Sequence, residues 1–430
     1  MRLGGADRYE AAVSVTKDTY SGSVDSVIVA SGEGFADALS AAPLSAKLQA
    51  PLLLVEGNRI PDVVAAELTR LHPAQILLVG GPGSVSPAVQ TSLEQFAPTV
   101  VRIWGSDRYT TSVELSKFGW PNGSESAFVA DGMVFADALS SAAAAAKLGG
   151  PILLLPGSDT ALPSSTHAEL GRLSISKAYI AGGPASVSPA IEQALAAPGR
   201  TITRFGGRDR FEVSANITSA IFSGHTDVYW ANGSAFADAL AGSAAAGARG
   251  AALLLVDGSC VPSSVYAASD KLLPGSTTIL GGPGTLSDGV RNGNECMTRP
   301  PGMSEADWSA AQTLYSSVNE ARFAQGLGGL RIAGGSAAAA PQDRALRLAN
   351  GSMQTSDSSQ APSWVRYQVS AVSGVATNRA QRTFDLMRSY GGTARWLYQP
   401  NGGVRGFVGV GFSTSGGKSG AVLYFGAGLE

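Results

Sequence analysis

The hexapeptide FADALS occupies residues 35–40, recurs letter for letter at residues 135–140, and returns as FADALA at residues 236–241. The copies therefore lie about 100 residues apart. A period of this length is the size of a small domain and is much longer than the unit of a solenoid repeat. The recurrence predicts three homologous domains in tandem.

Three further motifs accompany each copy of this hexapeptide, in the same order and at similar spacing. The first is R-x-x-G-x-D-R followed by an aromatic residue, the second is a Leu-rich run, and the third contains Gly-Gly-Pro. They lie at residues 2–9, 51–55 and 79–87 in the first copy, at 102–109, 151–155 and 181–189 in the second, and at 204–211, 252–256 and 280–288 in the third. The repeat therefore extends well beyond the hexapeptide.

Short apolar runs alternate with helical segments within each copy. In the first copy the runs SVIVAS, PLLLV, ILLVG and VVRIW are rich in Val, Ile and Leu, which is typical of strands buried on both faces of a sheet. Pro61 and the pair Ser86 and Pro87 open helical segments, since Ser is a preferred N-cap and Pro fits the first helical position. This alternation implies right-handed crossovers, so each copy is predicted to be a small, doubly wound α/β domain with a parallel sheet.

Composition and charge exclude two classes of partner. The chain has 430 residues, of which 44% are hydrophobic, and a formal net charge of −2. Up to Gly302 there are 20 basic and 26 acidic residues, and from Met303 onward 11 basic and 7 acidic, so neither part has the basic excess typical of nucleic-acid binding. No apolar run approaches the roughly 20 residues that cross a membrane, and the first residues lack the features of a signal peptide. We expect no membrane span, and a protein that is either cytosolic or has lost its export signal.

The two cysteines, Cys260 and Cys296, are separated by 36 residues and form no CxxC motif. No cluster of histidines accompanies them, so a metal site is not expected. The pair is predicted either to form a disulfide, which we favour, or to remain as two buried thiols. A disulfide would indicate an oxidising compartment.

The opening motif, FADALS, the Leu-rich run and GGPxSVS together resemble the cell wall binding repeat type 2 (CWB2), which occurs in triplicate on surface proteins of Gram-positive bacteria. The resemblance covers about two thirds of the chain. It implies a Rossmann-like fold for each repeat, a pseudo-threefold trimer within one chain, and non-covalent attachment to an anionic secondary polymer of the wall. On this assignment a disulfide between Cys260 and Cys296 would stabilise the third, terminal repeat. The expected domains are repeats at residues 2–101, 102–203 and 204–298, a linker at 299–305, and a C-terminal domain at 306–430.

Three aspartates are candidate binding residues because each lies near the start of the helix that follows a buried strand. They are Asp37, Asp137 and Asp238. Open α/β sheets place ligands at the carboxyl ends of their strands, which is where these side chains should lie. Each carboxylate either stabilises the helix dipole alone or fixes a basic or hydroxyl-bearing partner, at a ligand groove or between copies.

Three arginines, Arg8, Arg108 and Arg210, follow an aspartate that is expected to cap a helix. A guanidinium suits bidentate contact with a carboxylate or phosphate, and three of them on one body could bind an anionic polymer by multivalency. The alternative is an ion pair with the candidate aspartates of a neighbouring copy. The Gly-Gly-Pro stretches lack the Gly-Lys-Ser/Thr ending of a phosphate-binding loop and predict tight turns.

Residues 306–430 resemble the CAP superfamily, also called SCP-like. The segment LYSSVNEARFAQGLGGLRI at 314–332 predicts a helix, and GFVGVGFSTSGGKSGAVLYFGAG at 406–428 predicts a hairpin, which gives an α+β layer. The resemblance implies an α-β-α sandwich. CAP domains often hold a divalent metal between two histidines, but this sequence has no histidine after His225. We therefore expect no metal, no cofactor and no catalysis, and a degenerate binding or effector module with a protein or glycan ligand.

Three functions compete on these observations. The favoured one is a secreted, cell-wall-associated protein without enzymatic activity, whose repeats anchor it and display the C-terminal domain. The second is a wall-active hydrolase that uses acidic residues such as Glu320, Asp343 or Asp385 without a metal. The third is a cytosolic α/β enzyme with nucleotide sites at the FADALS ends.

Overall fold

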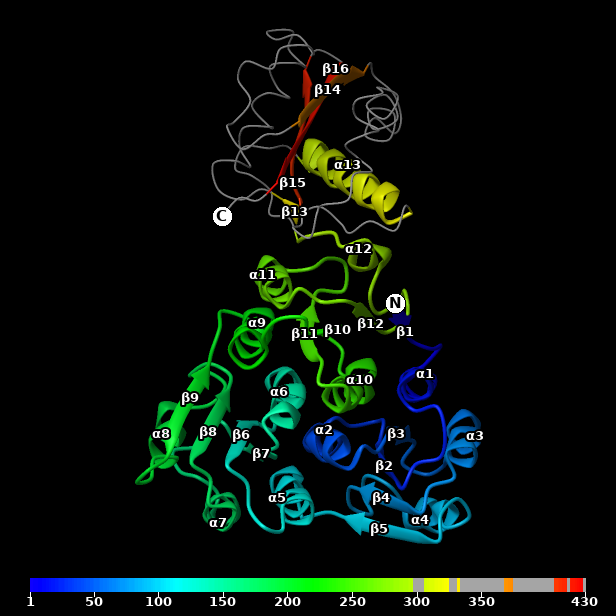
Figure 1. The fold of residues 1–430 in the computed structure, drawn as a ribbon, viewed down its shortest axis with the longest axis vertical. Coiled ribbons are helices and arrows are strands. Elements are labelled where there is room, and N and C mark those ends of the chain that lie inside the picture. The colour runs from blue at the N-terminus through cyan, green and yellow to red at the C-terminus, as the bar shows by residue number, and fades with distance from the viewer. Residues whose placement is uncertain (297–304, 325–330, 333–366, 374–405, 416–417, 428–430) are drawn as a thin grey trace. The chain divides into compact units, whose positions relative to one another are not determined.

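The computed structural model describes residues 1–296, 305–324, 331–332, 367–373, 406–415 and 418–427 (Figure 1). It divides into two compact units. The first contains Met1–Gly258 and Pro262–Ser287, and the second contains Ser259–Val261 and Asp288–Glu430.

The first unit contains three parallel sheets of four strands, in the orders β3-β2-β4-β5, β7-β6-β8-β9 and β1-β12-β10-β11. The runs SVIVAS, PLLLV and ILLVG form strands that are buried as the sequence predicts. The prediction is wrong for VVRIW, because β5 is an edge strand in which only Ile103 is buried. The bounds are β1 Arg2–Leu3, β2 Ser26–Ser31, β3 Leu52–Val55, β4 Gln75–Val79, β5 Thr99–Ile103, β6 Ser126–Asp131, β7 Ile152–Leu155, β8 Lys177–Ala181, β9 Thr201–Phe205, β10 Val228–Asn232, β11 Ala252–Val256 and β12 Thr277–Leu280.

Each sheet is completed by the strand that leads into the next repeat. In β5, Arg102 of the second opening motif is in register with Leu78 of β4, and in β9 Arg204 is in register with Ile180 of β8. The third sheet has no following repeat and is completed by β1, where Leu3 is in register with Leu280. The three repeats therefore close into a ring, and the expected boundaries at 101/102 and 203/204 fall inside β5 and β9.

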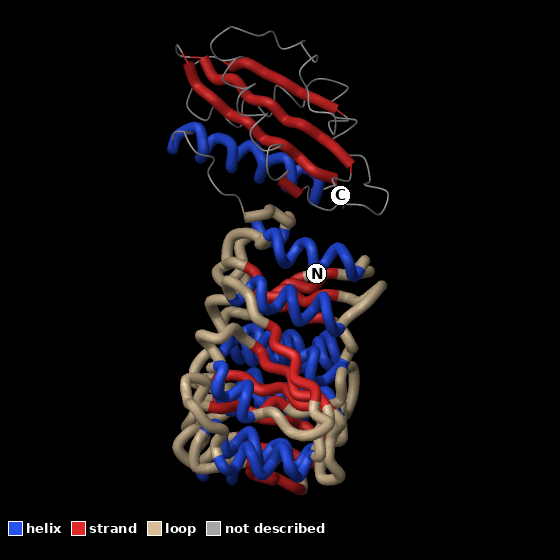
Figure 2. Tube along the Cα trace, turned by 90° about the vertical axis from the view of Figure 1, so that its left-hand side faces the viewer, coloured by secondary structure: helices blue, strands red, loops and turns tan. Residues whose placement is uncertain are grey.

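Helices cover both faces of these sheets, and three of them meet at the centre of the unit (Figures 1 and 2). The central helices are α2 (Ala36–Leu48), α6 (Phe135–Lys147) and α10 (Ala237–Ala248), each of which packs against the other two. The remaining helices of the unit are α1 Arg8–Thr19, α3 Asp62–Leu71, α4 Pro87–Leu93, α5 Arg108–Gly119, α7 Ser164–Leu173, α8 Pro189–Ala194, α9 Arg210–Ile221 and α11 Ser263–Leu272.

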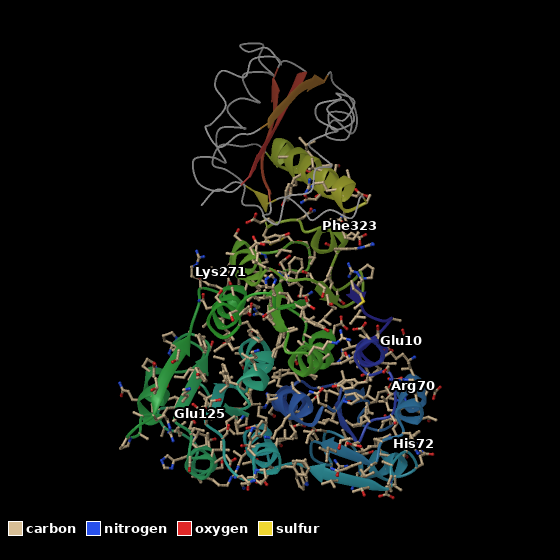
Figure 3. The ribbon with its side chains drawn as sticks, viewed as in Figure 1. Glu10, Arg70, His72, Glu125, Lys271 and Phe323 are labelled. Carbon is tan, nitrogen blue, oxygen red and sulfur yellow. A yellow bond between two sulfur atoms is a disulfide. The ribbon has the colours of Figure 1, made fainter. Side chains whose placement is uncertain are left out.

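Small residues allow the central helices to approach closely. A Cβ placed on Gly247 of α10 would lie 2.9 Å from the Cβ of Ala146 and 3.0 Å from the Cβ of Ala46. These three positions are equivalent in the repeats, so they meet at the pseudo-threefold axis. Arg70 of α3, which is paired with Glu67, lies at the outer edge of the unit (Figure 3).

The predicted capping residues start the outer helices. Asp7 accepts hydrogen bonds from the backbone N–H groups of Tyr9 and Glu10, and Asp107 and Asp209 cap α5 and α9 in the same way. Ser86 accepts from the N–H of Val89 at 3.3 Å, with Pro87 at the first helical position. The prediction for α3 differs by one position. Pro61 precedes the helix instead of occupying its first turn, because its ψ of 144° is extended.

The described part of the second unit is a four-stranded sheet with the order β13-β15-β16-β14 and a helix, α13, that packs against β15 (Figure 2). The predicted hairpin is confirmed, since β15 and β16 pair antiparallel from Gly406 with Ala427 to Ser415 with Lys418. A four-residue helix, α12, precedes α13. The bounds are α12 Asp288–Arg291, α13 Glu305–Phe323, β13 Arg331–Ile332, β14 Tyr367–Ser373, β15 Gly406–Ser415 and β16 Lys418–Ala427.

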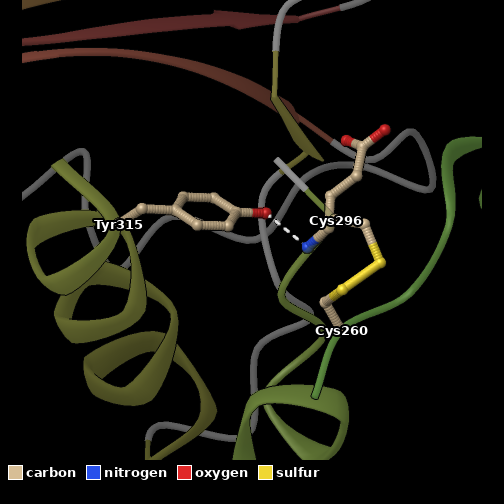
Figure 4. The surroundings of a disulfide bond; sticks show 4 residues. Cys260, Cys296 and Tyr315 are labelled. Carbon is tan, nitrogen blue, oxygen red and sulfur yellow. Dashed lines mark hydrogen bonds between the residues drawn. A yellow bond between two sulfur atoms is a disulfide. The ribbon is translucent and has the colours of Figure 1, made fainter. Parts of the chain in front are cut away.

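The second unit also contains the disulfide between Cys260 and Cys296, with a Cα–Cα distance of 4.9 Å (Figure 4). Beside it, the backbone N–H of Glu295 donates to the hydroxyl of Tyr315 on α13 at 2.9 Å. Asn294 donates from Nδ2 to Ser316 Oγ at 2.9 Å. Hydrogen bonds therefore join the disulfide-linked segment to α13.

Candidate functional site

The three FADAL segments converge at one end of the central helices. Phe35, Phe135 and Phe236 form a triangle whose ring centroids are 5.9, 5.5 and 5.9 Å apart, with interplanar angles near the edge-to-face arrangement that aromatic pairs favour. Each ring comes from a different repeat, so the triangle marks the pseudo-threefold axis at this end of the ring.

Each candidate arginine lies over a phenylalanine of the preceding repeat. The guanidinium carbon of Arg108 is 5.5 Å from the centre of the Phe35 ring, and those of Arg210 and Arg8 are 5.7 and 5.6 Å from Phe135 and Phe236. These separations are within the range of cation–π attraction. The three contacts follow one another around the ring, and the one from Arg8 closes it.

The same guanidiniums hold the loop that precedes FADAL in their own repeat. Arg108 donates from Nη1 to the carbonyl of Gly132 at 2.7 Å, Arg210 donates to Gly233 at 2.5 Å, and Arg8 donates to Gly32. Among the described residues, no second hydrogen-bond acceptor binds any of the three guanidiniums. Each therefore retains further N–H donors, since a guanidinium has five.

The candidate aspartates bind a hydroxyl of their own repeat. Asp37 accepts from Ser84 Oγ at 2.9 Å, and Asp137 and Asp238 accept from Ser186 and Thr285 in the equivalent Gly-Gly-Pro loops. Each candidate aspartate thus has a hydroxyl-bearing partner within its own repeat. No ion pair joins these aspartates to the candidate arginines within the part of the chain that the structure describes.

Burial dominates the electrostatics of the aspartates. It raises the pKa of Asp37, while the hydrogen bond from Ser84 and the charge of Arg108 in the next repeat offset part of this effect. The pKa of Asp137 is raised for the same main reason, against the hydrogen bond from Ser186 and the charge of Arg210. The charges of neighbouring repeats therefore act on each carboxylate without direct contact.

The Gly-Gly-Pro loops are shaped by close approach of the aspartates. Gly80 has a φ of +112°, and a Cβ added to it would lie 2.6 Å from Asp37 Oδ2. Arg102 of the next opening motif donates to the carbonyls of Gly80 and Val85 at 2.8 and 2.9 Å. Gly80 therefore allows the backbone turn, and Arg102 of the second repeat binds this turn of the first repeat. This agrees with the tight turn predicted from the sequence.

A groove of about 630 Å³ lies between the first and second repeats, beside the phenylalanine triangle. It includes two candidate residues, Asp37 and Arg108, and the wall residue Trp104, whose side chain is 47% exposed. Its lining also includes Ser31, Glu33, Gly34, Phe35, Ala36, Gly81, Pro82, Gly83, Ser84, Gly105, Ser106, Asp107, Thr111 and Phe236.

The sequence predictions missed several residues of this region. They did not assign a role to the phenylalanines, to Ser84 and its equivalents, or to Trp104. Comparison of the three copies could have found the first two, because FADAL and the hydroxyl residue of the Gly-Gly-Pro motif recur in all of them. Glu320 lies exposed on α13, whereas Asp343 and Asp385 lie outside the described residues.

One protein family, described as Cell wall binding domain 2 (CWB2), matches residues 2–90, 102–192 and 204–291. N-acetylmuramoyl-L-alanine amidase LytC of Bacillus subtilis is 32% identical over 257 residues, which are 60% of this chain and 50% of that protein. The amidase enhancer of Bacillus subtilis is 30% identical over 297 residues, 68% of this chain and 39% of that protein. The chain thus spans half or less of the length of these relatives.

Two solved structures share the fold. Cwp8 from Clostridium difficile is 26% identical with a TM-score of 0.61, and the match covers 67% of this chain and 50% of that chain. Cwp6 from Clostridium difficile is 22% identical with a TM-score of 0.63, and the match covers 74% and 57%. None of the helices in the described segments combines the length and the apolar character needed to cross a membrane.

Proposed function

Because the chain belongs to the Cell wall binding domain 2 (CWB2) family, we propose that its first unit anchors it non-covalently to an anionic secondary polymer of the bacterial cell wall. The matched repeats are wall-binding units, and the chain is a cell-wall-associated protein. We propose, in addition, that the polymer is anionic and that the arginines described above contact it.

The observation that carries this proposal is the convergence of three equivalent sites around the phenylalanine triangle. The ring centroids are no more than 5.9 Å apart, so the adjoining sites are close enough for one polymer chain to contact more than one of them. Several weak contacts on one rigid body raise the overall affinity without a tight individual site.

The arginines supply the contacts to acidic groups. Arg8, Arg108 and Arg210 each use one nitrogen for a glycine carbonyl and keep further donors, and a guanidinium binds phosphate or carboxylate through parallel hydrogen bonds. The first unit has an excess of acidic residues, so attraction is local to these groups and does not arise from its net charge.

Sedimentation of the full chain with purified cell walls tests the anchor. We expect co-sedimentation with intact walls and its loss when the secondary polymer has been extracted. Arg210→Gln should weaken binding, because Arg210 is equivalent to Arg108 but lies outside the acidic groove between the first two repeats. Arg59→Gln, which changes a surface arginine of the same unit that is paired with Glu56, should not weaken it. Undiminished binding to extracted walls would refute the polymer assignment, and equal effects of the two substitutions would refute the role of Arg210.

For the C-terminal domain we propose a degenerate CAP-like module without catalytic activity, displayed by a secreted protein. The support is the absence of histidine after His225. The alternative is a metal-independent hydrolase, which the amidase and amidase enhancer among the relatives favour. The full chain should release no soluble fragments from purified walls. Release that is lost on changing the exposed Glu320 to Gln would instead establish the hydrolase.

A further inference from the structure

We propose that the groove between the first and second repeats binds an uncharged, hydroxyl-rich sugar ring of the wall polymer, stacked on Trp104. This inference rests on the proposed anchoring function and assigns a specific ligand chemistry to one of its sites. It concerns residues that the other two repeats do not share.

The first observation is the position of Trp104. It directly follows β5, at the carboxyl edge of the first sheet, where open α/β sheets place ligands. Tryptophan is on average a well-buried residue, yet this side chain is 47% exposed on the wall of a groove. The flat apolar face of an indole matches the C–H face of a pyranose ring.

The second observation is the backbone beneath the indole. A Cβ added to Gly81 would lie 2.9 Å from the six-membered part of the Trp104 ring, so the ring rests on the Gly-Gly-Pro loop of the first repeat. The positions equivalent to Trp104 are Gly4 and Gly206. The aromatic platform is therefore particular to this groove.

The third observation is the charge of the lining. The groove presents the carboxylates of Glu33, Asp37 and Asp107 against the single guanidinium of Arg108. Glu33 is replaced by Met133 and Ser234 in the other repeats. An anionic group would be repelled by the surplus of carboxylates.

The polar lining suits sugar hydroxyls instead. Carboxylates accept short, strong hydrogen bonds from hydroxyl groups, and the hydroxyls of Ser31 and Ser106 add groups that both donate and accept. The volume of about 630 Å³ is that of a small-molecule site. The polymer would then place a neutral sugar in this groove and its acidic groups at Arg8 and Arg210.

The test uses oligosaccharides made by partial hydrolysis of the extracted wall polymer and separated by anion exchange into neutral and anionic fractions. Binding to the full chain is followed by calorimetry and by the change in tryptophan fluorescence. The neutral fraction should bind, and Trp104→Gly, which reproduces the residue of the other repeats, should weaken it by at least about tenfold. Trp104→Phe should retain most of the affinity.

Gly206→Trp provides a gain-of-binding control. A Cβ at Gly206 would have its nearest neighbour, the Cα of Gly183, at 3.5 Å, which is an ordinary van der Waals distance, so the backbone there accepts a side chain. This variant should bind the neutral fraction at least as tightly as the wild type. The affinity of the wild type for the neutral fraction should change less than about threefold between about 0.05 and 0.5 M salt, because this ligand forms no ion pair with the protein.

The outcomes separate this inference from the anchoring function. If Trp104→Gly binds the neutral fraction like the wild type, or if only the anionic fraction binds, the inference is wrong even though the protein still sediments with walls. If the wild type fails to sediment with intact walls, the anchoring function itself is wrong. Loss of neutral binding in Trp104→Gly and its recovery in Trp104→Phe support the inference.

Discussion

The contact between Arg108 and Phe35 should couple the second repeat to the first by about 1 kcal/mol. The guanidinium carbon lies 5.5 Å from the ring centre, near the outer limit of about 6 Å for this attraction. Both side chains are half-buried, so the energy should lie between the value of about 0.5 kcal/mol for exposed pairs and about 2 kcal/mol for desolvated pairs.

A double-mutant cycle measures this coupling. Phe35→Leu keeps an apolar side chain of similar size, and Arg108→Gln keeps a donor for the carbonyl of Gly132. The free energies of unfolding of the wild type, both single variants and the double variant are obtained from urea titrations of the full chain. The sum of the single effects should exceed the effect of the double variant by about 1 kcal/mol.

The pseudo-threefold arrangement extends the prediction to two equivalent contacts, those of Arg8 with Phe236 and of Arg210 with Phe135. The equivalent distances for Arg8 and Arg210 are 5.6 and 5.7 Å, so their cycles should give the same coupling within about 0.5 kcal/mol. The exposed pair of Arg59 and Glu56 is the control, and solvent screening should leave its coupling within experimental error. Additive effects in all three cycles would refute a cation–π attraction between repeats.

Three further predictions concern stability. Burial raises the pKa of Asp37, so its contribution to the unfolding free energy is largest below the unfolded pKa and falls as pH rises through the folded pKa. Asp37→Asn, which still accepts from Ser84, should lose less stability than the wild type as pH rises above the unfolded pKa of about 3.9. An unchanged pH dependence would contradict the raised pKa. Replacing Cys260 and Cys296 together by Ser should lower the unfolding free energy by about 3 to 4 kcal/mol, because the bond closes a loop with a sequence separation of 36 residues. A thiol reductant should reproduce the loss, and an unchanged urea midpoint would exclude it. Gly80→Ala should lower the unfolding free energy by about 2 to 3 kcal/mol, because Gly80 has a positive φ and its Cβ would approach Asp37. Gly83→Ala is the control and should leave the unfolding free energy unchanged, since its Cβ would meet no atom within 4 Å. Equal stability of the two variants would contradict the close approach.

Local features of the sequence predicted much of the fold. The repeat of FADALS, the runs of Val, Ile and Leu, and the capping residues Asp7 and Ser86 each act over a few neighbouring residues, and the structure confirms the strands and helices that they predict. The hairpin of β15 and β16 was predictable for the same reason, because alternating apolar residues flank a Ser- and Gly-rich segment of the sequence.

Features that depend on tertiary pairing were not predictable in this way. The run VVRIW is predicted as part of the first copy, and β5 pairs there. The pairing of β1 with β12, which completes the third sheet, joins the first strand of the unit to its last and has no local signal. The partner of Asp37 is Ser84, which lies 47 residues away, and only the parallel arrangement of the strands brings the two together. No local signal distinguishes Trp104, because a single residue that differs from Gly4 and Gly206 in the other copies resembles ordinary sequence variation.

The completion of every sheet by its successor has a consequence for chains with fewer repeats. A single repeat has a sheet of three strands, an unpaired edge on β4, and a leading strand with no sheet to enter. Three separate copies of one repeat could pair the backbone groups at this edge only by domain swapping, in which the leading strand of each copy pairs with the sheet of another copy. A protein made of one such repeat should therefore be a strand-swapped homotrimer, whereas the present chain achieves the same closure within a single molecule through β1 and β12.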